Sequence, residues 1–355
     1  METRVHWIDN CKALAICLIA LGHMQSIDWI SEIIFSYILP TFFFASGYTF
    51  VKSAEMPFGK LLQKKFRSLI IPYFGFSAVL LAFWYFIRRN FGLICQSSDI
   101  NPSDILLQIL CGVNSEFFIT PLWFLTCLFV TECLFWILLR FPKKHIAGTI
   151  IFFLFFWGIY YFTYIDNQQF SHILWNVDRS CFYLYFLVAG YIVSKRGIID
   201  RFLCSSRRNA LAILVGMAVF TSLFTLRNGI SASWLVLPVQ AVLYNVASFT
   251  FIAIAKVIPQ NPLLDFIGKN TLTILALHMM VQSLLRGALF KLFQVYPETL
   301  RDSFVLSSVL TIISIVLLFP AIILINRFIP WLAGRARVSR NSTPKHSSTY
   351  GKTNP

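Results

Sequence analysis

The fold follows from one segment, Trp7-Ile8-Asp9-Asn10-Cys11-Lys12-Ala13-Leu14-Ala15-Ile16-Cys17-Leu18-Ile19-Ala20-Leu21-Gly22-His23, an apolar run that carries a cation and an imidazole. Lys12 and His23 are eleven positions apart. On an α-helix this spacing is about three turns, or roughly 16 Å of rise, with both side chains on nearly the same face. Ionisable groups inside a membrane helix are costly and therefore indicate function. The segment predicts a membrane span beside which a long ligand enters near Lys12 and reacts near His23.

The whole chain has the composition of a polytopic membrane protein. Its 355 residues are 57% hydrophobic, 17% aromatic and 13% charged, with a mean hydropathy of +0.70. A soluble domain carries about 25% charged residues. A net charge of +15 would suggest nucleic acid in a soluble protein, but these basic residues lie in short loops between apolar runs, where they indicate orientation. We therefore expect membrane lipids, and no nucleic acid, among its partners.

Apolar stretches of about 17–25 residues predict an all-α protein with about ten transmembrane helices. We place them near residues 13–30, 33–51, 68–87, 121–139, 146–162, 179–194, 209–226, 234–255, 270–289 and 304–328. An even number of spans puts both termini on one side, and this side holds roughly 23 of the 30 basic residues, so both termini are predicted to be cytoplasmic. Residues 1–337 form the predicted transmembrane domain, and the polar stretch 338–355 is a predicted disordered cytoplasmic tail.

Cysteine usage gives little evidence of metal or redox chemistry. The eight cysteines form no CxxC pair and no Cys/His set with zinc spacing, so we expect no metal site. Cys95 and Cys111 share the long predicted outward loop 88–120 and would pair only if that loop faces an oxidising compartment.

Lys12 and the two intramembrane histidines each have more than one interpretation. Lys12 is either a topology-setting cation that snorkels to the interface or part of a binding site. His23 is either a packed helix histidine or a general base, because an unperturbed pKa of about 6.5 suits proton abstraction from a hydroxyl at neutral pH. For His278, within the predicted span 270–289, orienting a partner, binding substrate and packing all stay open.

Two further motifs have a structural explanation beside a functional one. Ala45-Ser46-Gly47 in the second span permits close helix approach, while Ser46 is also a candidate nucleophile or hydrogen-bond donor. The basic run 60–67 reads as a cytoplasmic loop that sets topology and attracts anionic lipid. Alternatively, Lys64 and Arg67 bind phosphate groups near a helix start.

The outer ends of two predicted spans carry candidate acceptor contacts. Trp123 is either a belt tryptophan or a ring beside a carbohydrate. Asp178-Arg179 is a neighbouring charged pair that is either structural or binds a polar acceptor. We identify no acidic residue central to a predicted span, and this weakens the main alternative, a transporter or flippase of a glycan precursor. A non-catalytic scaffold would leave the intramembrane histidines unexplained.

Taken in order, these segments resemble acyltransferase family 3, the integral-membrane O-acyltransferases of bacterial envelopes, over residues 7–328. The start of the chain is similar to the family's signature of a basic residue, a ten-residue spacer and a histidine. Most described members have Arg at this position. This chain has Lys12, and the subgroup that resembles fucose 4-O-acetylases also has Lys there. The departure from Arg weakens bidentate phosphate recognition. The other similar blocks are 40–48, 64–73, 122–125, 186–191 and 267–278.

The resemblance implies a bacterial inner-membrane enzyme that transfers an acyl group, usually acetyl, from cytoplasmic acetyl-CoA to a hydroxyl of a cell-envelope carbohydrate. The acceptor would be O-antigen, common antigen or an exopolysaccharide, free or lipid-linked. His23 takes the catalytic position and Lys12 the basic one, with Lys64 and Arg67 expected near the CoA phosphates. Direct transfer and a covalent acyl-enzyme are both left open. Candidate substrate or supporting residues are Ser46, Trp123, Arg179 and His278.

Overall fold

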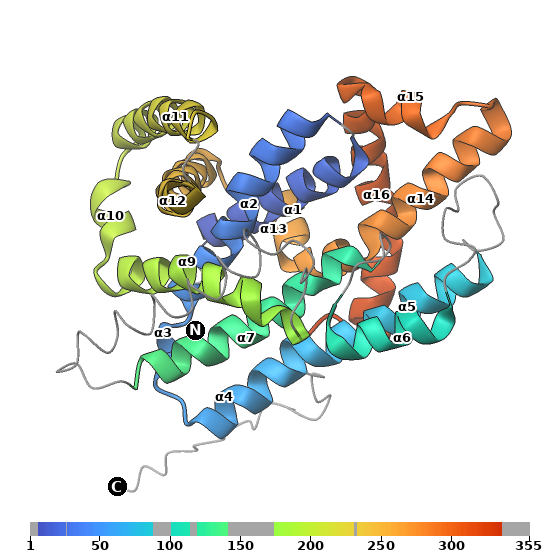
Figure 1. The fold of residues 1–355 in the computed structure, drawn as a ribbon, viewed down its shortest axis with the longest axis horizontal. Helices are drawn as coiled ribbons and strands as arrows, with labels where there is room; N and C mark the ends of the chain where they lie inside the picture. The colour runs from blue at the N-terminus through green and yellow to red at the C-terminus, as the bar shows by residue number, and fades with distance from the viewer. Residues whose placement is uncertain are drawn as a thin grey trace, which may run out of the picture.

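The computed structural model describes residues 6–25, 27–87, 101–113, 119–140, 174–230 and 233–335 (Figure 1). All regular structure in these ranges is helical, which confirms the all-α prediction. The helices are α1 (His6–Met24), α2 (Asp28–Thr49), α3 (Val51–Ala54), α4 (Phe58–Lys65), α5 (Ile71–Phe86), α6 (Pro102–Cys111), α7 (Trp123–Leu138), α9 (Val177–Lys195), α10 (Ile198–Phe202), α11 (Ser206–Asn228), α12 (Ser233–Val257), α13 (Pro262–Lys269), α14 (Thr271–Phe293), α15 (Pro297–Asp302) and α16 (Phe304–Phe328). A π-helical turn, η1 (Phe66–Ile70), joins α4 to α5, and 3-10 turns span Thr120–Leu122 and Leu174–Asn176.

Within the described ranges, eight helices are long and apolar enough to cross a membrane. They coincide with eight of the ten predicted spans. The predicted span 179–194 forms α9, a helix of 19 residues that is not among these eight and whose sequence includes Asp178, Arg179 and Lys195. The predicted span 146–162 and the predicted tail 338–355 lie outside the described residues. The protein is therefore a polytopic membrane protein, and the number ten stays a prediction.

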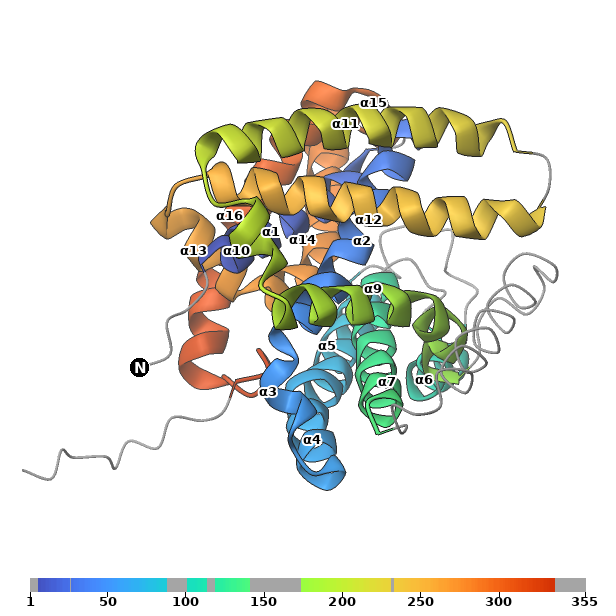
Figure 2. The same cartoon turned by 90° about the vertical axis from the view of Figure 1, so that its left-hand side faces the viewer.

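Helix α1 lies at the centre of the bundle, where it contacts α2, α12, α13, α14 and α16 (Figure 1). Its buried small residues, Ala13, Ala15, Ala20 and Gly22, let these neighbours approach closely. In contrast, α11 lies at the periphery beside α12 and leaves most of its apolar side chains uncovered (Figure 2). The segment with the unusual cation and imidazole is thus the core helix rather than a lipid-facing one.

Helices α2 and α9 meet at a pair of glycines. A Cβ atom built on Gly47 would overlap the carbonyl oxygen of Leu187, and one on Gly190 would overlap the carbonyl oxygen of Phe44. Both positions therefore need glycine for the backbones to touch. The predicted close helix approach at Ala45-Ser46-Gly47 is confirmed, and it places Ser46 beside the contact between α2 and α9.

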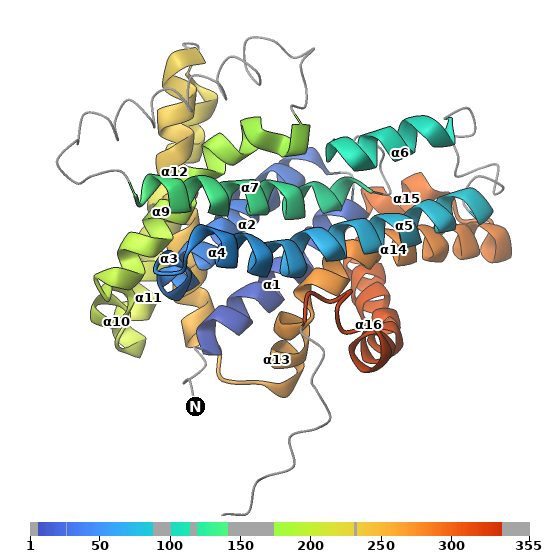
Figure 3. The same ribbon diagram turned by 90° about the horizontal axis from the view of Figure 1, so that it is seen from below.

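The basic run 60–67 is helical, so its prediction as a loop was wrong. Helix α4 continues through η1 into α5, and the three form one 29-residue unit, Phe58–Phe86, that is apolar beyond its basic start and lies beside α7 (Figure 3). Lys, Leu and Gln are good helix formers, and these residues dominate α4. A π turn adds one residue to a helix and changes which side chains share a face, and such turns often mark functional sites.

Candidate functional site

The start of α1 is held by hydrogen bonds and by close backbone contact. Asn10 Nδ2 donates to the carbonyl oxygens of Ala255 (3.3 Å) and Ile258 (3.0 Å), at the end of α12. On α13, a Cβ at Gly268 would overlap the carbonyl oxygen of Asp9. The residues around Lys12 are therefore fixed against the segment that leads into α14.

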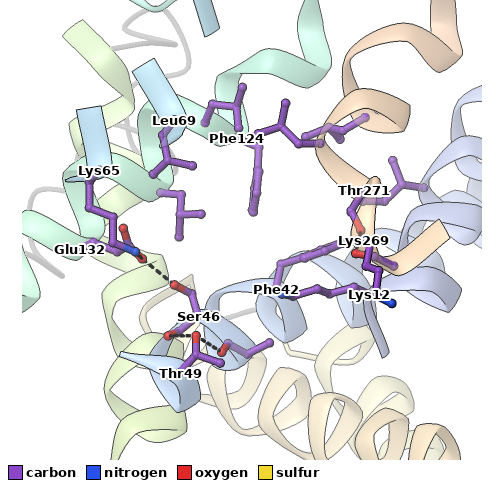
Figure 4. Close-up of a pocket in the computed structure, with 17 residues that line it drawn as sticks. Lys12, Phe42, Ser46, Thr49, Lys65, Leu69, Phe124, Glu132, Lys269 and Thr271 are labelled. Carbon is purple, nitrogen blue, oxygen red and sulfur yellow. Dashed lines mark hydrogen bonds and ion pairs between the residues drawn. The ribbon is translucent and has the colours of Figure 1, made fainter. Parts of the chain in front are cut away.

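A cavity of about 320 Å³ opens next to this anchor, a volume at the lower end of the range for small-molecule sites. Its walls come from α1, α2, α7, α13 and α14 and from the junction of α4 with η1 (Figure 4). Lys12 and Lys269 lie together on one side, across the cavity from Lys65 and Glu132. The remaining lining residues are the polar Ser46, Thr49 and Thr271, together with Gly268 and the apolar Ile19, Phe42, Ala45, Leu69, Phe124, Leu125, Leu128, Leu272 and Leu275.

A buried ion pair forms one wall of the cavity. Glu132 on α7 is 1% exposed, and its Oε1 accepts hydrogen bonds from Lys65 Nζ (2.5 Å) and Ser46 Oγ (2.7 Å; Figure 4). A charged carboxylate so far from water requires a partner of this kind. We call Ser46, Lys65 and Glu132 the ion-pair centre.

The prediction that no acidic residue lies central to a span was wrong, because Glu132 does. The residue lies near the middle of the predicted span 121–139, as the single carboxylate in an otherwise apolar and uncharged run. A lone carboxylate in such a run is itself the signal of a functional or paired group inside the membrane. The charge content of the spans therefore does not disfavour a transporter.

Lys64 and Arg67 do not line this cavity. With Lys60 and Arg335 they line a second, open groove of about 760 Å³, which also includes Trp331. Lys64 Nζ donates to Ser53 Oγ (3.4 Å). Neighbouring helix residues point about 100° apart, so Lys65 reaches the cavity while Lys64 faces the groove.

The groove and the cavity adjoin at the start of α14. Arg335, which lines the groove, donates through Nη2 to the carbonyl oxygen of Lys269 (2.6 Å) and to Asn270 Oδ1 (2.9 Å). Lys269 in turn lines the cavity. The basic residues of the open groove and of the cavity that contains Lys12 thus meet at the contact between Arg335 and Lys269.

His23 and His278 form a second polar centre, which we call the histidine centre. Their ring centroids are 5.3 Å apart, and the Phe35 ring lies 5.2 Å from that of His23. His23 is half-buried in the last turn of α1, whereas His278 is fully buried in α14. Nearby, Gln282 Nε2 donates to the carbonyl oxygen of Ala20 (2.8 Å), which ties α14 to α1 at this level.

The histidine centre lies one helical turn beyond the cavity. Ile19 and Leu275 line the cavity; His23 follows Ile19 by four residues and His278 follows Leu275 by three, so each histidine is stacked on a cavity-lining residue of its own helix. Lys12, the cavity and His23 thus follow one another along α1 in the predicted order. Neither histidine lines the cavity itself.

Trp123 and Arg179, two candidates from separate predicted spans, are in contact. The guanidinium carbon of Arg179 lies 4.6 Å from the centroid of the Trp123 ring, within the range of a cation–π interaction. Trp123 adjoins Phe124, which lines the cavity. The pair therefore lies next to the cavity without lining it.

Comparison with known proteins identifies the chemistry of this arrangement. The family model described as an acyltransferase domain matches residues 5–326. The chain belongs to acyltransferase family 3. No curated protein and no solved structure matches it. The matched range contains the whole cavity and both histidines, so the site lies within the acyltransferase domain. The similarity to the fucose 4-O-acetylase-like subgroup stays a prediction.

In this acyltransferase, the described residues contain no group of three or more His, Cys, Asp or Glu side chains placed to hold a metal ion. Cys111 is a free cysteine, and Cys95 lies outside the described residues. The groups near the cavity are thus cations, one carboxylate, hydroxyls and imidazoles. Such a set suits binding of an anionic ligand and proton transfer.

Proposed function

We propose that the protein is an O-acetyltransferase of the bacterial inner membrane, with cytoplasmic termini. It moves an acetyl group from acetyl-CoA, bound from the cytoplasmic side, to a hydroxyl of a cell-envelope carbohydrate, free or lipid-linked. The observation that carries this proposal is the cavity that Lys12 and Lys269 line together with Ile19, which lies one turn before His23 on α1. Two lysines on one side and a mostly apolar lining fit a ligand with a charged head and a long uncharged arm.

The donor's phosphates are best accommodated by the groove outside the cavity. Lys60, Lys64, Arg67 and Arg335 line it, and clustered basic side chains are the usual partners of phosphate groups. Because the groove adjoins the cavity at Lys269, phosphates held there leave the pantetheine arm to pass Lys12 and run along α1. Lys64 and Arg67 then bind the phosphates of the donor, and Lys12 and Lys269 lie beside the start of its pantetheine arm.

The reaction requires a base for the attacking hydroxyl, and we assign this role to His23. As the hydroxyl oxygen attacks the thioester carbonyl, the imidazole removes its proton; the C–S bond then breaks, and the imidazolium returns the proton to the CoA thiolate. A positioned general base contributes on the order of 10²–10⁴ in rate. The attack also places negative charge on the carbonyl oxygen, which needs a hydrogen-bond donor. We do not assign that role to Ser46, because its hydroxyl hydrogen is already donated to Glu132.

The test is O-acetylation of the envelope glycan, measured by mass spectrometry with and without the gene. Deletion is expected to remove one acetyl unit per modified sugar and leave the glycan in place, whereas loss of the whole glycan would favour transport. Purified protein is expected to release CoA from acetyl-CoA when the de-O-acetylated glycan is added. A His23→Ala variant that reaches the membrane and acetylates normally would remove His23 from the mechanism.

A further inference from the structure

The orientation of His278 is fixed by its own helix. Its Nδ1 lies 3.0 Å from the carbonyl oxygen of Ile274 and 2.9 Å from that of Leu275. Carbonyl oxygens only accept hydrogen bonds, so Nδ1 carries the hydrogen. In the neutral ring the lone pair is then on Nε2, which is the arrangement that second partners impose on catalytic and metal-binding histidines.

The lone pair of Nε2 has no donor among the residues that the structure describes. Nε2 is buried, and the side chain as a whole is 0% exposed. A buried acceptor without a donor is costly, and nearly all such groups in native proteins find one. A purely structural role, in which the histidine packs and bonds to its own helix, explains the contacts of Nδ1. It does not explain why Nε2 is buried without a donor.

The nearest imidazole is that of His23, at a spacing that suits a hydrogen bond. Two imidazole rings joined through an N–H···N bond of about 2.9 Å have centroids roughly 5 Å apart, and these rings are 5.3 Å apart with an interplanar angle of 40°. The bond between Gln282 and the Ala20 carbonyl holds the two helices at this level. A hydrogen bond between the two rings requires the half-buried His23 ring to turn so that one N–H points at Nε2 of His278.

We propose that His278 is a positioning residue for His23: its Nε2 accepts a hydrogen bond from one ring nitrogen of His23, so that the other nitrogen presents its lone pair to the attacking hydroxyl. The inference rests on the proposed function. When His23 gains the hydroxyl proton, the same hydrogen bond stabilises its imidazolium; the proton then leaves to the thiolate, and His278 ends as it began. A base oriented by a third group is the general logic of catalytic triads.

The experiment compares His278→Leu with His278→Gln, two side chains of similar size. Glutamine keeps an acceptor oxygen near the position of Nε2, and leucine has none. Purified variants in lipid nanodiscs are assayed with radiolabelled acetyl-CoA and the de-O-acetylated glycan of deletion cells. We expect His278→Leu to lower kcat on the order of 10²-fold with an unchanged KM for acetyl-CoA, and His278→Gln to retain most of the wild-type kcat. If His278→Leu fails to fold, His278→Met takes its place.

The matched control is Ser314→Ala on α16. Ser314 is buried and donates to a carbonyl of its own helix, that of Thr311 (2.7 Å), as His278 does, and its loss should leave kcat within about twofold. Wild-type kcat in His278→Leu, equal losses in the leucine and glutamine variants, or a loss confined to KM overturns the inference. A wild-type protein that transfers no acetyl group contradicts the proposed function itself, so the two failures are distinguishable.

Discussion

The ion-pair centre and the histidine centre are both buried in the bundle, but they differ in how their polar groups are satisfied. In the first, Glu132 Oε1 receives two hydrogen bonds, and the charges of Lys65 and Glu132 compensate each other. In the second, both groups are imidazoles, and Nε2 of His278 receives none. Each centre keeps one buried acceptor without a donor among the described residues, Glu132 Oε2 in the first and His278 Nε2 in the second, so the difference lies in charge. Opposite charges hold the first centre together and suit it to the wall of the site, whereas the second brings two imidazoles side by side, a pair suited to proton transfer.

His23→Ala should have the largest effect on the rate and little effect on the fold. Removing the general base is expected to lower kcat by about 10²–10⁴-fold, measured as acetyl transfer by purified protein. The elution profile and apparent Tm in detergent should stay near those of the wild type, because His23 is only half-buried. A large fall in Tm would instead make the histidine centre structural and erase its contrast with the ion-pair centre.

Glu132→Gln should have the largest effect on stability. Breaking a buried ion pair leaves an uncompensated charge and typically costs about 3–5 kcal/mol, so the apparent Tm and the folded yield should fall sharply. The double variant Glu132→Gln with Lys65→Met removes both charges and should recover much of that loss. Equal stability of the single and double variants would show that the pair does not hold the wall.

Lys12→Ala should have a smaller effect than either of these variants, and it should weaken donor binding. Loss of one charge-assisted contact is expected to raise the KM for acetyl-CoA about tenfold, equivalent to roughly 1.4 kcal/mol. Lys12→Arg should retain most of the affinity because the charge is kept. Equal damage from both variants with an unchanged donor KM would argue that Lys12 sets topology rather than binding phosphate.

The smallest effect is expected from single changes in the open groove. Lys64→Ala and Arg67→Ala should each raise the KM for acetyl-CoA about threefold, because several exposed cations share the phosphates and water screens each of them. The control is Lys291→Ala, another exposed cation, at the end of α14. If all three variants behave alike, the groove does not bind the donor.

The sequence indicated the helices and the order of groups along α1, because long apolar runs and an eleven-residue spacing depend only on local geometry. It did not indicate that Lys65 rather than Lys64 faces Lys12's cavity. That choice depends on α4 continuing through a π turn into α5, and propensity does not reveal such a turn. Nor can periodicity show that His278 faces His23, since the pairing of α1 with α14 is a tertiary contact between segments more than 250 residues apart.

The extra residue in the π turn at Phe66–Ile70 determines which basic side chain of α4 faces the cavity. Deleting one residue there would restore regular α geometry and rotate α4 by about 100° relative to α5. Lys65 would leave Glu132, and a different basic side chain would face the cavity, with no change in composition beyond that one residue. Such a variant should lose the ion pair as Glu132→Gln does, visible as the same fall in Tm. Insertions and deletions, more than substitutions, would then be the means by which this segment changes the ligand that it admits.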